Sequence, residues 1–309
     1  MTRFDRFMQS ALYHPERGYY SARIKTVGSR GDFTTTAQLS NILARAIAHR
    51  FSQSGLRHLI EVGPGTGQLA HEVNKALPFL TKIKTQQHLV EVSQPLQALQ
   101  KKLLPKATHH PSIHSALTSA KGEAFIYSNE LVDAFPVRIF RKESHHWSEL
   151  HLSGSQGAIE EHFLAAEQLP DSHLFQKSFP LQQRIEVHQS YQEWLQSWTP
   201  HFHKGQLLTI DYTTPSPRLI PGTLRGYFLQ DRLSGPNLYQ NAGHIDLTAD
   251  VEFDDIEQWG QTLGLKTLSR QSQRDFLQPF SKGTAPDNFL TDPQGAGTAF
   301  EVLLQAPNT

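Results

Sequence analysis

The spacing of apolar residues alternates between two periods along the first half of the chain. Where they recur every three or four positions, the pattern predicts amphipathic helices. Such segments lie at residues 3–20 (running into a turn), 38–51, 68–77 and 95–104. Short continuous apolar runs predict buried strands at residues 58–62, 88–92 and 124–128. Strands that alternate with helices are typical of an α/β fold with a doubly wound, Rossmann-like parallel sheet.

This alternation breaks after residue 135 and returns near residue 206. Within the interruption, the pattern predicts a hairpin, an irregular stretch and one long helix: residues 137–152, 153–180 and 181–198. The returning pattern predicts a strand, a second strand, a helix and a last strand: residues 206–211, 224–228, 254–263 and 300–304. The interruption therefore predicts an α+β cap region inserted over the carboxyl ends of the sheet strands.

A length of 309 residues fits one large core with such an insertion. We expect an N-terminal helical segment that covers the ligand site, a core in two parts, and an inserted cap that binds substrate: residues 1–57, residues 58–135 with 201–309, and residues 136–200. The absence of cysteine excludes disulfides, thiolate metal sites and cysteine nucleophiles. No apolar run approaches the roughly 20 residues of a membrane span.

Acidic and basic residues balance over the whole chain, with 29 of each, whereas nucleic-acid-binding proteins usually have a basic excess. Residues 1–60 nevertheless hold nine basic and three acidic residues, and residues 246–309 hold four basic and ten acidic ones. This asymmetry fits either two solvated surfaces that neutralise each other or a basic face for an acidic partner protein. The 17 histidines lack His-Glu-x-x-His spacing, so we expect scattered surface histidines and no metal site.

The strongest motif is the glycine-rich sequence EVGPGTG at residues 61–67, which follows a predicted strand and opens a predicted helix. Its three glycines allow a tight turn and a close approach of the backbone to a ligand. Glu91 ends the next predicted strand, 28 residues after Gly63, where a carboxylate can accept hydrogen bonds from ribose hydroxyls. The combination predicts a dinucleotide or nucleoside site.

The spacing within this loop favours S-adenosylmethionine over NAD and ATP. The dinucleotide motif is G-x-G-x-x-G, and it places a pyrophosphate at a helix N-terminus. This chain has G-x-G-x-G, preceded by Glu61, whose carboxylate would repel a phosphate but attract the cationic amino-acid portion of S-adenosylmethionine. The sequence Gly67-Gln68-Leu69 also lacks the Lys-Ser/Thr of a P-loop.

Ordered sequence blocks across nearly the whole chain resemble the MidA-like family of class I S-adenosylmethionine-dependent methyltransferases. That family includes the mitochondrial complex I assembly protein arginine methyltransferase. Besides the glycine loop, the blocks are residues 14–15 with 18–20, 31–35, 91–93, 129–136, 184–186, 210–212, 222–225 and 243–248. The chain departs from the family at Thr213, where glycine is usual, and at residues 228–230, near which histidine is usual.

The resemblance implies a methyltransferase sheet with an inserted cap, S-adenosyl-L-methionine as cofactor, and arginine on a partner protein as acceptor. The expected cofactor-binding residues are Gly31, Asp32, Phe33, Glu61, Gly63, Gly65, Gly67, Glu91, Ser93 and Asn129. The resemblance alone suggests that Asp32 and Phe33 fold over the cofactor, because spacing at Gly31-Asp32 indicates only a turn.

Three acidic residues near predicted strand ends are catalytic candidates: Glu130, Asp133 and Asp211. A guanidinium keeps its charge because its pKa exceeds about 12, so carboxylates can bind it bidentately, orient one nitrogen and accept its proton late. The alternative for Asp133 is a helix N-cap, and for Asp211 a structural hydrogen bond to the next loop. Arg184 and Glu186 are expected to form a surface ion pair on the long helix, with substrate docking as the alternative.

Three classes of function stay open. The first is methylation of an arginine on a partner protein, for which a respiratory-complex subunit is one candidate. The others are a nucleic-acid or small-molecule methyltransferase and a cofactor-binding assembly factor with little catalysis. Asn129 lies where amide- and base-modifying enzymes of this fold carry Asn or Asp, but the neutral net charge weighs against nucleic acid. The expected location is the cytoplasm, or the mitochondrial matrix of a eukaryote, and the oligomeric state is not indicated.

Overall fold

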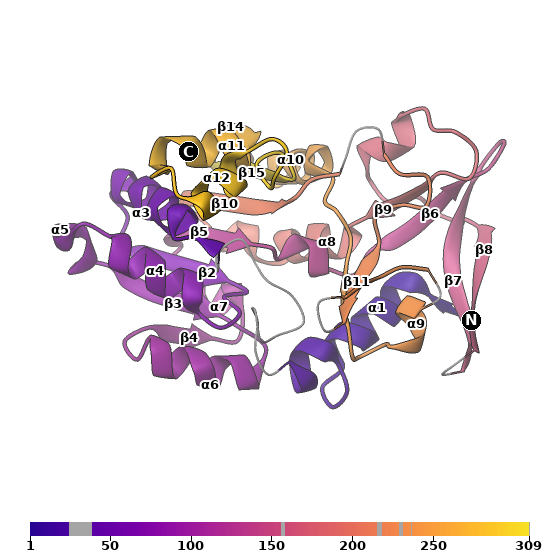
Figure 1. The fold of residues 1–309 in the computed structure, drawn as a ribbon, viewed down its shortest axis with the longest axis horizontal. Coiled ribbons are helices and arrows are strands. Elements are labelled where there is room, and N and C mark those ends of the chain that lie inside the picture. Colours follow the sequence, from indigo (N-terminus) through magenta and orange to yellow (C-terminus); the bar gives the residue numbers. More distant parts are fainter. Residues whose placement is uncertain (25–38, 156–157, 215–217, 229–230, 236, 309) are drawn as a thin grey trace.

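A seven-stranded sheet forms the centre of the computed structural model, which describes residues 1–24, 39–155, 158–214, 218–228, 231–235 and 237–308 (Figure 1). Its strands, in spatial order, are β14 (Leu265–Ser272), β15 (Phe300–Pro307), β10 (Lys204–Tyr212), β5 (Glu123–Asn129), β2 (His58–Val62), β3 (Gln86–Val90) and β4 (Thr108–His110). The last five of these run parallel, and β15 runs antiparallel to both of its neighbours. This order confirms the predicted doubly wound α/β sheet.

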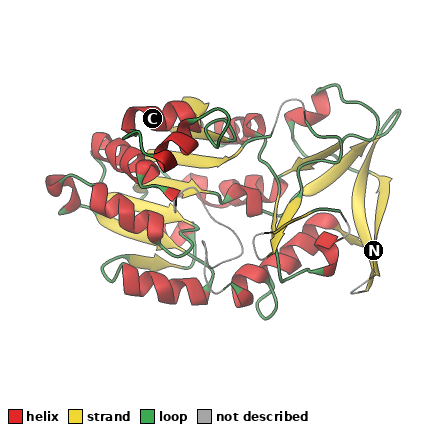
Figure 2. Ribbon diagram, in the orientation of Figure 1, coloured by secondary structure: helices red, strands yellow, loops and turns green. Residues whose placement is uncertain are grey.

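Helices cover both faces of this sheet because the side chains of its strands alternate between them (Figure 2). Phe125 and Tyr127 of β5 point to one face, and Ala124 and Ile126 point to the other. The first face packs against α3 (Ile42–Ser54), α4 (Gln68–Ala76), α11 (Gln273–Leu277) and α12 (Ala285–Thr291). The second packs against α7 (Ile113–Ser119), α8 (Gln189–Trp198) and α10 (Phe253–Thr262). In the described part of the chain, no helix combines the length and apolar content needed to cross a membrane.

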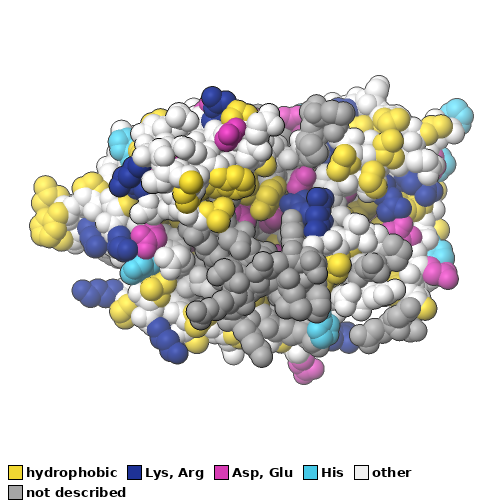
Figure 3. Space-filling model, in the orientation of Figure 1, with side chains coloured by type: hydrophobic (Ala, Val, Ile, Leu, Met, Phe, Trp, Pro, Cys, Tyr) yellow, Lys and Arg dark blue, Asp and Glu magenta, His cyan; other side chains and the backbone are white. Residues whose placement is uncertain are grey.

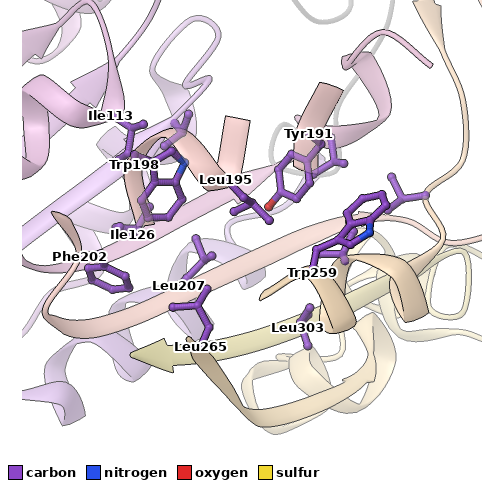
Figure 4. Packing of buried hydrophobic residues seen from close by; sticks show 14 of the residues in the cluster. Ile113, Ile126, Tyr191, Leu195, Trp198, Phe202, Leu207, Trp259, Leu265 and Leu303 are labelled. Carbon is purple, nitrogen blue, oxygen red and sulfur yellow. The ribbon is translucent and has the colours of Figure 1, made fainter. Parts of the chain in front are cut away.

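Helix α8 lies directly on the sheet, although it comes from the region predicted to be a cap. Its Tyr191, Leu195 and Trp198 are fully buried and point toward the strands, where they meet Ile126 of β5 and Leu207 of β10 (Figure 4). The spacing of these three residues places them on one side of the helix. The opposite side of α8 therefore faces away from this core cluster.

Two smaller sheets lie beside the central one (Figure 1). One contains β1 (Thr2–Arg3), β7 (Trp147–Ser155), β6 (Arg138–Lys142), β9 (Arg184–Val187) and β8 (Ala158–Ala165), and the other contains β12 (Asp231–Leu233), β11 (Arg225–Phe228) and β13 (Asp246–Thr248). Helix α1 (Phe4–Tyr13) packs its buried Phe4, Met8 and Leu12 against strands of both sheets and against α9 (Asn237–Gln240). The short helices α5 (Phe79–Lys82) and α6 (Gln94–Leu103) flank β3 in the chain. Strand β1 and helix α1 therefore pack the N-terminal residues against strands of the predicted cap region.

The predicted long helix over residues 181–198 is wrong in its first half. Residues 184–187 form β9, which pairs antiparallel with β6, and α8 begins at Gln189. Buried Ile185 continues the helical spacing of α8 by coincidence, while Leu181 is 60% exposed. The predicted irregular stretch 153–180 is also wrong in part, because it contains strand β8, which pairs with β7.

The expected surface pair of Arg184 and Glu186 is wrong for the same reason, since both lie on β9. Glu186 is 1% exposed and accepts a hydrogen bond from the Thr223 amide at 2.8 Å. Its other oxygen lies 3.4 Å from Nη1 of Arg218, whereas Arg184 binds Glu161 at 2.6 Å. These ion pairs join β9 to the segment before β11 and to β8.

His88 and His110 are buried, which corrects the expectation of scattered surface histidines. Neighbouring strands place His58, His88 and His110 in one row, with the ring nitrogens of successive residues 3.0 and 2.9 Å apart. Burial lowers the pKa of His88 to about 4, so its ring is neutral near pH 7. A neutral imidazole has one donor and one acceptor, so such a row satisfies buried polar atoms without burying charge.

Charges of the two terminal segments are paired within the fold. Arg45 donates to Asp287 at 3.0 Å, and Arg270 binds Asp254 at 2.8 Å and Glu257 at 3.0 Å. On the face drawn in Figure 3, basic and acidic side chains are interspersed. The Arg45–Asp287 pair joins the two terminal segments through a buried carboxylate, whereas the Arg270 pairs lie within the second segment.

Truncation of the buried face of α8 tests this packing. We expect Leu195→Ala to lower the free energy of unfolding by about 2–5 kcal/mol, because it leaves a cavity beside β5 and β10. Leu181→Ala is the matched control, since its side chain is 60% exposed, and it should cost less than about 0.5 kcal/mol. Urea unfolding of both variants measures the difference, and equal values would contradict the assigned packing.

Candidate cofactor and acceptor site

A cavity of about 700 Å³ opens at the carboxyl ends of β2, β3 and β5. This is the position at which doubly wound sheets bind their ligands, and the volume is in the range of small-molecule sites. Its lining comes from the glycine loop, the ends of β3 and β5, the start of α7, helix α1 and one side of α8. The core, the N-terminal helix and the predicted cap region therefore all contribute to one site.

The glycine loop takes the tight path that its sequence predicts. Gly63, Gly65 and Gly67 all have positive φ, at +66°, +53° and +83°. A Cβ at Gly63 would lie 2.7 Å from Cδ1 of Leu131, so a side chain there would also displace the end of the Leu131 side chain. Gly63 and Gly65 line the cavity, whereas Gly67 lies behind it, beside Gln100 of α6.

Glu61 is a carboxyl group buried in the wall of the cavity. It is 3% exposed and accepts a hydrogen bond from the Tyr127 hydroxyl at 2.8 Å. Burial raises the pKa of Glu61 to about 8, because removal from water disfavours the charged form. The group is therefore ready to ionise if a cation binds beside it.

Glu91 lies at the end of β3, on the other side of the glycine loop. Its Oε1 accepts from the Ser93 amide at 2.8 Å, and its Oε2 accepts from Nε2 of Gln100 at 3.2 Å. Burial raises the pKa of Glu91 to about 7. Ser93 is fully buried and does not line the cavity. It acts on the site through its backbone amide, which donates to Glu91.

Glu130 follows β5 in a backbone conformation that is unusual for a residue with a side chain. Its φ is +52°, a strained value that persists only where surrounding contacts hold it. Those contacts come from β10: the Glu130 amide donates to the Ile210 carbonyl at 3.0 Å, and Asp211 accepts from the amides of Leu131 and Val132 at 3.0 and 2.7 Å. The result is a fixed turn that directs this segment into the cavity lining.

Among the described residues, the side chains of Asn129 and Tyr212 donate to the Glu130 carboxylate. Nδ2 of Asn129 lies 3.1 Å from Oε1, and the Tyr212 hydroxyl lies 3.5 Å from Oε2. Asn129 and Glu130 both line the cavity. The carboxylate is thus held at the wall of the site by its neighbours in β5 and β10.

Asp211 and Asp133 lie behind this wall and do not line the cavity. Asp211 is fully buried, and burial raises its pKa to about 7. Its Oδ2 accepts from the amides of Leu131 and Val132, and its Oδ1 accepts from the amide of Tyr212 at 2.9 Å. Asp133 is 4% exposed, and its pKa is raised by burial and by the nearby carboxyl groups of Asp211 and Asp246, against the opposing effect of Arg225. Asp211 thus holds the turn that carries Glu130, while Asp133 lies three residues after Glu130, buried behind the cavity wall.

Sequence reasoning missed the part of the lining that comes from outside the central sheet. Tyr13 and Tyr20 stack with ring centroids 5.6 Å apart at the cavity wall, and the Tyr20 hydroxyl donates to Asp246 at 2.6 Å. Tyr20 belongs to the family block at residues 18–20, but the resemblance assigns it no role. Gly31, Asp32 and Phe33, which were expected to cover the cofactor, lie outside the described residues.

The charge of the cavity wall is one-sided. Among the described lining residues there are four carboxyl groups, those of Glu61, Glu91, Glu130 and Glu193, and no lysine, arginine or histidine. Such a wall disfavours phosphate-containing ligands and suits cations and hydroxyl donors. A cofactor with a sulfonium, an ammonium group and a ribose diol fits this chemistry and the glycine turn.

Comparisons with known proteins agree with this geometry. A family profile for S-adenosyl-L-methionine-dependent methyltransferases matches residues 42–270. The chain is 26% identical to the mitochondrial protein arginine methyltransferase NDUFAF7 homolog of Drosophila melanogaster, over 97% of this chain and 80% of that protein. It is also 26% identical to the mitochondrial protein arginine methyltransferase NDUFAF7 of Rattus norvegicus, over 88% of this chain and 69% of that protein.

Solved structures give the same answer. A Burkholderia thailandensis protein crystallised with S-adenosyl-homocysteine has a TM-score of 0.85 and 25% identity, covering 98% of this chain and 87% of that one. The fold and the site thus define an S-adenosylmethionine-dependent methyltransferase. The chain belongs to the MidA-like family of these enzymes, and its cofactor is S-adenosyl-L-methionine.

A pair of glycine substitutions tests the cofactor loop. Gly65→Val and Gly55→Val both place a branched side chain at positive φ, which costs about 1–2 kcal/mol or more, but Gly55 has open space around it and ends α3, away from the cavity. We expect both to lower the melting temperature and only Gly65→Val to lose S-adenosylhomocysteine binding by calorimetry, at least about tenfold. Unchanged affinity of Gly65→Val would contradict the assignment of this loop.

Proposed function

We propose that this methyltransferase transfers its methyl group to an arginine side chain of a partner protein. The observation that carries the proposal is the one-sided wall, in which four carboxyl groups and no basic residue line the described part of the cavity. A guanidinium is a permanent cation that suits such a wall, whereas a nucleic acid would bring repelled phosphates. The curated relatives support the same acceptor, because both are protein arginine methyltransferases.

At the cofactor end, we propose that Glu61 balances the positive charge of the amino-acid portion of S-adenosylmethionine. Glu91 accepts hydrogen bonds from its ribose hydroxyls. Bound S-adenosylmethionine supplies an electrophilic methyl group on a sulfonium. Gly63 and Gly65 let the backbone approach the ligand, and the Ser93 amide and Gln100 hold the Glu91 carboxylate in place. Asn129 completes this end of the site beside Glu130.

At the acceptor end, we propose that Glu130 binds the guanidinium and orients one nitrogen toward the methyl group. Its two oxygens can accept two parallel N–H bonds, and one of them takes the proton that the methylated nitrogen loses. Asn129 and Tyr212 fix the carboxylate, which limits the geometries that the acceptor can adopt. Asp211 acts as a positioning residue through the turn, and the raised pKa of Asp133 favours an uncharged carboxyl group behind it.

The names of the relatives also bear on the partner and the compartment. Both are mitochondrial, which supports the mitochondrial option of the two locations expected from the sequence. A protein acceptor follows from their activity, and we propose a respiratory-complex subunit as one candidate for it.

Replacement of Glu130 tests the acceptor chemistry. With methyl-labelled cofactor and arginine-containing peptides or cell lysate, we expect wild-type protein to label arginine, and Glu130→Gln to lose about 10²–10³ in turnover with nearly unchanged S-adenosylhomocysteine affinity. The amide keeps the shape but can neither pair with the cation nor accept its proton. Label in nucleic acid, or wild-type turnover of Glu130→Gln, would exclude the proposal.

Asp211→Asn is the matched comparison for a positioning role. The amide side chain is a weaker acceptor for the two backbone N–H groups of the turn, so we expect the free energy of unfolding to fall by about 1–3 kcal/mol. Turnover should fall together with it. Glu130→Gln should leave stability close to wild type. A variant of Asp211 that loses turnover alone would instead assign this acid a direct part in the reaction.

The raised pKa of Glu91 predicts a pH-dependent affinity. Below about pH 7 the Glu91 carboxyl group of the ligand-free protein is protonated and accepts hydrogen bonds from ribose hydroxyls poorly, so it should lower cofactor affinity by about tenfold for each further pH unit. This loss adds to the one that protonation of Glu61, with a pKa of about 8, causes below pH 8. Calorimetry with S-adenosylhomocysteine between about pH 8.5 and pH 6 measures this slope. Glu91→Gln should bind more weakly at high pH and reduce the slope. Equal slopes in the two proteins would show that another group titrates.

A further inference from the structure

Helix α8 presents to the cavity a face that is separate from the glycine loop and from Glu130. Ser190, Glu193, Trp194 and Ser197 line the cavity at i, i+3, i+4 and i+7, which is one side of a helix. Figure 4 shows residues of the opposite side, packed against the sheet. The cavity-facing side is therefore fixed in place by a rigid core.

Glu193 is the fourth carboxyl group of the wall and is exposed at its edge. Within the described part of the chain, no ion pair involves it; it accepts a hydrogen bond from Nε2 of Gln189 at 3.0 Å. Glu193 contributes to the raised pKa of Arg3, but that guanidinium is already bound by Asp5 at 2.6 Å and lies 3.7 Å from Glu149. The charge of Glu193 is thus available to a ligand.

The neighbours of Glu193 also suit a cation. The indole of Trp194 is held by stacking on Tyr191, with centroids 5.4 Å apart, and by an edge contact with Phe135 at 5.5 Å. The hydroxyls of Ser190 and Ser197 donate to the carbonyls of Pro136 and Trp194, so their lone pairs are left to accept N–H groups. An aromatic face, a carboxylate and hydroxyl acceptors together recognise ammonium or guanidinium groups.

We propose that this face of α8 is a subsite for a second basic side chain of the acceptor protein, a lysine or arginine close in sequence to the methylated arginine. The inference rests on the proposed arginine acceptor and goes beyond it by stating which sequence context the enzyme prefers. The other three carboxyl groups of the wall belong to the sheet end of the cavity: Glu61 begins the glycine-loop motif, Glu91 follows β3 and Glu130 follows β5. Glu193 comes from α8 and is therefore placed for a different part of the ligand. An acidic side chain next to the target would be repelled there.

Short fluorescent peptides with one arginine test the subsite. Their flanking positions carry lysine, a neutral residue or glutamate, and anisotropy in the presence of S-adenosylhomocysteine measures binding. We expect wild-type protein to prefer the lysine-flanked peptide over the neutral one by about three- to fivefold at low salt, because an exposed ion pair is weak and screened. Glu193→Gln should remove this preference, and Glu193→Lys should favour the glutamate-flanked peptide. Glu160→Gln, which changes a 77% exposed acid on β8 outside the cavity lining, should behave like wild type.

Methyl transfer to the same peptides separates this inference from the proposed function. If wild-type protein methylates lysine-flanked and neutral peptides with equal KM and binds them equally, the subsite is wrong and the arginine acceptor stands. If it neither binds nor methylates any arginine peptide, both are wrong. If the flanking preference in KM disappears in Glu193→Gln and persists in Glu160→Gln, the subsite is supported.

Discussion

The hydrogen bonds from Leu131 and Val132 to the Asp211 carboxylate hold the site together. They attach the turn after β5 to the end of β10, and they satisfy two backbone N–H groups that would otherwise be buried without partners. Glu130 can keep its strained backbone only because these bonds and the neighbouring strand pairing over-determine the turn. The orientation of the candidate acceptor-binding carboxylate is therefore a consequence of parallel pairing in the central sheet.

The same site carries an electrostatic cost that its ligands can offset. Glu61 and Glu91 have pKa values raised by burial, so their ionised forms are unfavourable in the ligand-free protein. Both folded-state pKa values exceed those of an unfolded chain, so their contribution to stability is present at low pH and declines as pH rises toward 7 and 8. A bound cation instead favours the ionised forms of Glu61 and Glu91. Binding of the cofactor and ionisation of the wall are thus coupled, which favours a cation over a neutral ligand of the same shape.

The central sheet and the cofactor loop could be predicted from the sequence because both depend on local patterns. Buried parallel strands leave continuous apolar runs, and residues 61–67 place glycine where positive φ is needed. The cap could not be predicted in the same way. Strand β9 was hidden because Ile185 happens to continue the period of α8, and a buried acid such as Glu186 resembles a surface residue until Thr223 and Arg218 are brought to it by long-range contacts.

The part of the site that sequence reasoning missed follows from the same limitation. A helix pattern identifies one apolar face, and for α8 the apolar period of Tyr191, Leu195 and Trp198 marks the side that is buried against the sheet. The pattern assigns the remaining polar positions to solvent by default. In this protein helix α1 and residues 134–136, which precede β6, line the same cavity as that side, so Glu193 and Trp194 are cavity residues. A polar face on a helix that is itself anchored in the core is therefore ambiguous between solvent and ligand. Only the tertiary arrangement, which no local period encodes, distinguishes the two.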